Sequence, residues 1–143
     1  MQLGAPEALP GIVIDDTQAR VVGSGKNSAT TSGYVGAGYL TDANEGKGEK
    51  TVTFTPQIPQ AGRYEVRIAY TAERNRATNV PVTVLHADGE NLITVNQRQA
   101  PTVDGLNPVD RADNLQIPIM VYHGDRDQTV PLEQSDWFVS KAK

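Results

Sequence analysis

The sequence predicts an all-β fold, an antiparallel β-sandwich. In residues 63–70 apolar and charged residues alternate with a period of two, as in a strand with one buried face. Asp88-Gly89 indicates a hairpin, because its turn needs a positive φ that glycine adopts without steric cost. The chain is also rich in Gly, Pro, Thr and Val, and it has no long helical periodicity before residue 130.

The first part of the chain predicts short elements. Residues 1–10 are expected to form a leader or linker, because one glycine and two prolines interrupt any regular structure. Residues 12–14 are expected to form a short apolar strand, and residues 20–22 another short strand. Asp15-Asp16 follow the first of them and could hold a cation such as Ca²⁺. A turn with a helix cap explains the pair equally well, and this is the interpretation we prefer.

Residues 23–48 are a long segment rich in Gly, Ser, Thr and Asn. This segment carries Tyr34 and Tyr39 among small residues. Aromatic faces in such a setting can form a platform for a sugar ring. The alternative is that both tyrosines plug the rim of the sandwich.

The central block predicts strands over residues 51–55, 63–70, 80–86 and 92–95. Between the second and the third lies the loop 71–79. Its planar donors and amides suit the recognition of polyhydroxyl or carboxylate groups, and they are Arg74, Asn75, Arg76 and Asn79. An equally good alternative is that these side chains tie a long loop to backbone carbonyls.

Composition excludes several functions. The chain of 143 residues has no cysteine and only two histidines, so thiolate and His-rich metal sites are ruled out, and we expect no metal or cofactor. Its net charge is −4 with scattered basic residues, which argues against nucleic acid as a partner. No apolar run approaches a membrane span. Residues 1–10 do not have the pattern of a signal peptide, so any export signal would have been removed or lie elsewhere.

Several motifs occur in the order of a known family. They include Gly11-Ile-Val-Ile-Asp-Asp16, Ala61-Gly-Arg-Tyr-Glu-Val66, Asn75-Arg-Ala-Thr-Asn79, His86-Ala-Asp-Gly89 and Val95-Asn-Gln97. Together with Tyr34 and Tyr39 they resemble the golvesin C-terminal-like module, also called the xanthan-lyase carbohydrate-binding-like domain, over about residues 11–105. The resemblance implies a jelly-roll β-sandwich that serves as a carbohydrate-binding accessory domain in exported bacterial proteins.

The sequence departs from that family in two places. Ser24-Gly25 stand where the family usually has a tryptophan, so a platform aromatic is expected to be missing. After Asp104-Gly105-Leu106 the family continues through further strands that close the sandwich, and this chain is expected not to do so.

Residues 107–143 are instead expected to form a strand-loop-helix appendage. The apolar run 117–121 is typical of a strand buried in a parallel sheet, and 132–143 has helical spacing. With the loop between them, they resemble α/β-hydrolases of the prolyl oligopeptidase and dienelactone hydrolase type. In that pattern Asp127 matches the acid of the catalytic triad.

A hydrolase triad cannot be completed within this chain. It needs a serine on a nucleophile elbow and a histidine after the acid, and no Gly-x-Ser-x-Gly precedes Asp127 and no His follows it. We therefore expect no catalytic residues. Alternatively, the strand at 117–121 takes the place of a missing sandwich strand and covers an open edge.

The domain organisation we predict is a leader at 1–10, a β-sandwich module at 11–106 and the hydrolase-like segment at 107–143. The preferred function is a non-catalytic accessory module that binds a glycan or polysaccharide outside the cell or in the periplasm. One alternative is a fragment or hybrid of a serine hydrolase. The other is a structural or interaction module, including an engineered chimera, with an open sheet edge that could form a homodimer.

Overall fold

The computed structural model describes residues 5–9, 11–43, 45–46 and 48–101, and the backbone of four later strands. Its two short 3-10 helices are η1 (Pro6–Ala8) and η2 (Asp16–Gln18). The strands before residue 102 are β1 (Ile12–Asp15), β2 (Arg20–Val22), β3 (Lys26–Ser28), β4 (Tyr39–Thr41), β5 (Thr51–Phe54), β6 (Tyr64–Ala69), β7 (Val80–His86) and β8 (Gly89–Val95). The later strands are β9 (Asn107–Ala112), β10 (Met120–His123), β11 (Glu133–Gln134) and β12 (Asp136–Lys141).

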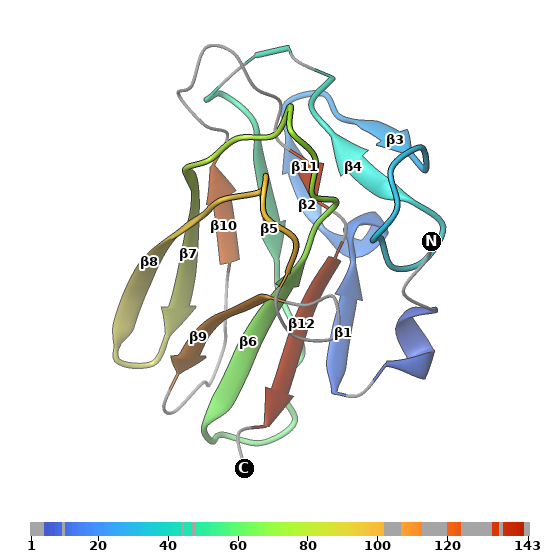
Figure 1. Ribbon diagram of the computed structural model, residues 1–143. Helices are drawn as coiled ribbons and strands as arrows, with labels where there is room; N and C mark the ends of the chain where they lie inside the picture. Colours follow the sequence, from blue (N-terminus) through green and yellow to red (C-terminus); the bar gives the residue numbers. More distant parts are fainter. Residues whose placement is uncertain are drawn as a thin grey trace.

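Two antiparallel sheets form the layers of a sandwich (Figure 1). One has the strand order β1-β12-β6-β9 and the other has the order β2-β5-β10-β7-β8. A third sheet, β11-β4-β3, lies at one end of the layers. The predicted all-β antiparallel sandwich is therefore confirmed.

The core lies between the two layers, and the alternation in the sequence decides which residues enter it. Along β6 and β7 every second residue is buried, as Val66, Ile68, Val82 and Val84 show. Phe54 of β5 is fully buried in the same cluster. Burial of each such side chain contributes roughly 1.5–3 kcal/mol to the free energy of unfolding, so these buried residues are the main source of stability.

The predicted hairpin is present, with its turn one position earlier than expected. Ala87 and Asp88 are the turn residues, and His86 pairs with Gly89 across the strands β7 and β8. Gly89 has a φ of 138°, a conformation that a side chain would strain. The Asp88 backbone N–H donates to Nδ1 of His86 at 3.3 Å, which helps to fix the turn.

The segment 23–48 contains strands that the sequence did not predict. It forms the short strands β3 and β4, which pair antiparallel from Lys26 with Thr41 to Ser28 with Tyr39. Their three residues each are too few, and too polar in β3, to show a periodic pattern in the sequence.

The prediction of a parallel-sheet strand in the C-terminal part was wrong. β10 lies inside the five-stranded sheet and pairs antiparallel with β5 on one side and with β7 on the other. A continuous apolar run is expected of any central strand, and its periodicity cannot distinguish a parallel neighbour from an antiparallel one. The alternative expectation, that this segment fills a position in the sandwich, is what the structure shows.

The helix predicted over residues 132–143 was also wrong, because β12 runs through 136–141 as a strand. It pairs antiparallel with β1 and β6, so that Trp137 lies opposite both Ile14 and Ile68. Trp137-Phe138-Val139 are strong strand formers, and β1 and β6 need backbone partners on their facing edges. Pairing therefore overrides a helical spacing that extends over only twelve residues.

The sheets are also closed by strands from the C-terminal part, contrary to the expectation that closing strands would be missing. β9 and β12 join β1 and β6 in one sheet, and β10 joins β2, β5, β7 and β8 in the other. The strand-loop-helix unit expected from the hydrolase resemblance is not formed. Asp127, its proposed acid, lies outside the described residues.

Candidate functional site

Two segments that carry the predicted ligand residues meet at one end of the sandwich. The loop 71–79 follows β6, and the segment 28–34 follows β3. Nη2 of Arg76 donates to Oγ1 of Thr31 at 3.3 Å. A Cβ added to Gly33 would lie 3.8 Å from the Tyr70 carbonyl oxygen, so the two segments also touch there. The structure thus brings together the two regions that the sequence suggested separately.

Arg76 is the centre of this junction and is buried, with 2% of its surface exposed. Nε donates to the Thr71 carbonyl at 3.2 Å, and Nη1 donates to Oδ1 of Asn75. With the bond to Thr31, the guanidinium reaches three different positions of the two segments. A buried charge is tolerated only when it is satisfied in this way. Arg76 therefore has a structural role in holding the loops.

Tyr39 is equally internal, with 2% exposed. Its hydroxyl accepts a hydrogen bond from Oγ of Ser28 at 3.1 Å and lies 3.1 Å from Oγ1 of Thr30. Tyr34 is half-buried, and its ring is tilted by 46° against that of Tyr39 with 6.1 Å between the ring centres. Tyr39 matches the alternative of a rim-filling residue, and Tyr34 keeps an accessible part.

The other predicted residues, Arg74, Asn75 and Asn79, are exposed. The Arg74 backbone N–H donates to Oε1 of Glu73 at 2.9 Å, which shapes the start of the turn. Oδ1 of Asn75 accepts from Arg76, so the buried arginine orients an exposed amide. The loop therefore presents hydrogen-bond donors from a fixed backbone.

A second turn, residues 96–99, is fastened to this loop and was not among the predicted site residues. The Gln97 backbone N–H donates to the Ala77 carbonyl at 2.9 Å, and Nε of Arg98 donates to the Arg76 carbonyl at 2.7 Å. The Tyr70 hydroxyl donates to the Gln99 carbonyl at 2.9 Å. Burial raises the pKa of Tyr70, which keeps this hydroxyl protonated as a donor.

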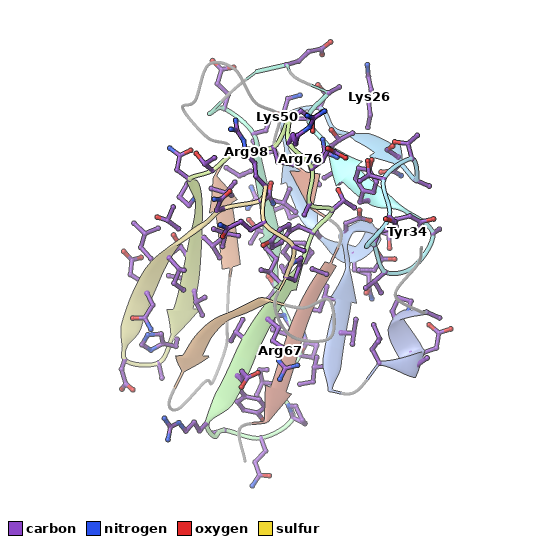
Figure 2. The ribbon with its side chains drawn as sticks, in the orientation of Figure 1. Lys26, Tyr34, Lys50, Arg67, Arg76 and Arg98 are labelled. Carbon is purple, nitrogen blue, oxygen red and sulfur yellow. The ribbon has the colours of Figure 1, made fainter. Side chains whose placement is uncertain are left out.

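Figure 2 shows Arg76, Arg98 and Lys50 gathered at this end of the sandwich, with Tyr34 at its side. Arg98 is exposed. Lys50 is used internally, because its Nζ donates to the Asp42 carbonyl at 2.8 Å. Arg98 could have been noticed in the sequence only as a planar donor directly after a strand, a weak pattern without the contact to Arg76.

A hollow of about 240 Å³ is bordered by the segment 27–29. It is lined by Asp15, Asp16, Thr17, Asn27, Ser28, Ala29, Ala37, Gly38 and Tyr39. Glycine is needed at position 38, because a Cβ there would lie 2.6 Å from the Ser28 carbonyl oxygen. The sequence analysis did not predict this hollow, which depends on the pairing of β3 with β4.

The pair Asp15-Asp16 forms the wall of the hollow and also caps η2. Oε1 of Gln18 accepts from the Asp15 backbone N–H at 3.0 Å, as in a capping box. Burial raises the pKa of Asp16 to about 7, and the hydrogen bond and charge of Asp15 add to this effect. Within the described residues no group of three or more His, Asp or Glu side chains could hold a metal ion.

Comparison with known proteins assigns the family. The golvesin C-terminal domain family matches residues 12–104. The chain belongs to this family. A xanthan lyase from Bacillus sp. (strain GL1) is 44% identical over 98 residues, which are 66% of this chain and 10% of that protein.

Solved structures extend the similarity beyond the family match. The Paenibacillus xanthan lyase superposes with a TM-score of 0.81 at 30% identity, over 92% of this chain and 13% of that one. A family 35 carbohydrate binding module from Clostridium thermocellum superposes with a TM-score of 0.56 at 14% identity, over 92% of this chain and 98% of the module. The second similarity shows the fold alone. The chain spans only about a tenth of the lyases it matches.

No helix in the described residues has the length and apolar character needed to cross a membrane.

Proposed function

We propose that this chain is a non-catalytic accessory module that binds polysaccharide. Membership of the golvesin C-terminal family supports this, as does the similarity to xanthan lyases, which are named for a polysaccharide. A module that is carbohydrate-binding by name has the same fold over nearly its whole length. The parent protein acts outside the bacterial cell, where such polymers occur.

The observation that carries the proposal is the junction at Arg76. This side chain bonds to the loop 71–79 and to Thr31, so it fixes both candidate segments relative to each other. Ligand contacts then come from the accessible side chains Tyr34, Arg74, Asn75 and Asn79, while Tyr39 and Arg76 support them. Fixed donors beside an aromatic surface suit sugar hydroxyls, because little conformational entropy is lost on binding.

The test is affinity electrophoresis of the whole chain in gels containing xanthan, alginate, dextran or β-1,3-galactan. We expect retardation by at least one polysaccharide, and a loss of about tenfold or more in affinity for Tyr34→Ala and Asn75→Ala. Arg63→Ala is the control, because Arg63 is exposed and precedes β6 at its other end, roughly 20 Å from the loop.

Each result bears on the proposal. Retardation of all three variants like that of the unchanged chain would place binding elsewhere on the surface. Absence of retardation in every gel, with a native circular dichroism spectrum, would refute polysaccharide binding.

We also propose that β8, the last strand of its sheet among the described residues, can pair with a second copy of the chain. β8 is an edge strand of the five-stranded sheet and is largely exposed, and Leu92 has 68% of its surface accessible. Unpaired edge strands favour such pairing. Analytical ultracentrifugation should show a dimer that Leu92→Lys weakens, and a strict monomer at high concentration would disprove it.

A further inference from the structure

The surface formed by the loop 71–79 and the turn 96–99 differs in charge from the rest of the molecule. The two segments together contain three arginines and one glutamate, a net charge of +2, in a chain whose net charge is −4. Arg74 and Arg98 are exposed, as is the acid, Glu73, whereas the charge of Arg76 is buried. A local excess of positive charge on an acidic protein favours an anionic ligand at this place.

Arg98 is held in a defined orientation on this surface. Its Nε donates to the Arg76 carbonyl at 2.7 Å, and its backbone N–H donates to Oδ1 of Asn96 at 3.0 Å. Its Nη1 and Nη2 donate no hydrogen bond to any of the described residues, and the residue is exposed. Nη1 and Nη2, which can donate two parallel hydrogen bonds to a carboxylate, are therefore accessible, while Nε holds the side chain in place.

The surrounding contacts make the surface rigid. The turn and the loop are joined by the bonds from Gln97 to Ala77, from Arg98 to Arg76 and from Tyr70 to Gln99. Gln97 is fully buried, so the turn cannot move away without opening the interior. A donor that is already fixed loses little freedom when it binds, which increases both affinity and selectivity.

We propose that this surface selects polysaccharides that carry carboxylate groups, and that Arg98 is the residue that recognises the carboxylate. This inference rests on the proposed function and names its ligand class. Neutral sugars would use the amides and the tyrosine equally well, but only an acidic sugar matches the paired donors of Arg98.

The experiment compares two forms of one polymer, xanthan and xanthan whose carboxylates have been reduced to alcohols. Affinities of the whole chain are measured by isothermal titration calorimetry at 50 and 300 mM NaCl. We expect at least tenfold tighter binding of the acidic form at 50 mM, and a smaller preference at 300 mM because salt screens the charges.

The variants separate charge from geometry. Arg98→Gln should abolish the preference for the acidic form. Arg98→Lys should keep only a part of this preference, because lysine retains the positive charge but lacks the two parallel donors of the guanidinium. Arg63→Gln is the matched control and should leave the preference unchanged. Melting curves of all variants show whether the turn is still folded.

The outcomes distinguish this inference from the proposed function. Equal affinity for both forms, or an unchanged preference in a folded Arg98→Gln variant, would overturn the role of the carboxylate and leave polysaccharide binding intact. Failure to bind any of the polysaccharides used here and above would overturn both.

Discussion

At the scale of single residues, Arg76 shows how a side chain that resembles a ligand contact can be a structural one. Its planar donor group and the amides near it in the sequence suit glycan recognition. However, only 2% of the residue is exposed, and all its side-chain nitrogens donate hydrogen bonds to protein atoms. The accessible donors around it owe their positions to this burial. The structural interpretation of the loop is therefore confirmed for Arg76, and the functional one stays a prediction for the exposed residues.

Replacing Arg76 by alanine should destabilise the fold. The change leaves the Thr71 carbonyl without its donor and releases the loop from Thr31, at a cost of about 3 kcal/mol. Chemical denaturation measures this, with Arg74→Ala as the control. Arg74 is exposed, so its replacement should change stability by less than about 0.5 kcal/mol. Equal effects of the two variants would contradict the structural role of Arg76.

Asp16 should make stability depend on pH in the direction opposite to most carboxylates. Its pKa is about 7 in the folded state and 3.8 by itself, so between these values the folded chain binds a proton that the unfolded chain does not. The contribution of protonated Asp16 to the free energy of unfolding is therefore complete below about pH 4, and it is lost as the pH rises towards 7.

Asp16→Asn tests this directly, because the amide imitates the protonated acid. We expect the variant to be more stable than the unchanged chain at pH 8, by on the order of 2 kcal/mol, and nearly equal at pH 4.5. Urea denaturation at both pH values gives the comparison, with the exposed Asp88→Asn as control. A variant that is less stable at pH 8 would show that Asp16 is needed as a carboxylate.

At the scale of elements, the C-terminal strands decide whether the sandwich exists. β10 lies between β5 and β7, and β12 lies between β1 and β6, so each supplies a central strand. Central strands pair their backbone groups on both sides, and removing one exposes two sheet edges and the core at once.

A chain that ends at residue 106 should therefore fail to fold, although it contains the whole stretch that matches the family. The ¹H–¹⁵N NMR spectrum should have the narrow dispersion of an unfolded protein. A chain that begins at Gly11 is the control and should stay folded, because η1 buries no residue. Wide dispersion in the shortened chain would mean that the sandwich closes without β10 and β12.

Sequence reasoning located elements where the pattern is long and one-sided. Val66 and Ile68 alternate with charged residues, so β6 was predictable, as was the β7–β8 hairpin, although its turn lies one position earlier than expected. The prediction failed at β12, because its aromatic and β-branched residues also fit the spacing of a helix. Pairing with β1 and β6 is what makes this segment a strand. At the candidate site, the chemistry of the loop residues could be proposed from the sequence, whereas Arg98 and the hollow at Asp15-Asp16 depend on contacts between distant segments.

At the scale of the whole molecule, the sandwich works as a rigid frame that presents loops from one end. The two sheets enclose the apolar core, and the junction of Arg76, Thr31 and the turn 96–99 lies at this end (Figures 1 and 2). A rigid frame with functional loops is a common arrangement, because loops can vary in sequence without disturbing the core.

The most direct test of this account is an NMR titration of the isotopically labelled chain with oligosaccharides released from xanthan. We predict that chemical shifts change in a saturable way at the amides of Arg74, Asn75, Asn79 and Arg98, and that the amides of the β7–β8 hairpin stay unchanged. Saturable changes confined to the hairpin, or no changes at millimolar ligand, would contradict it.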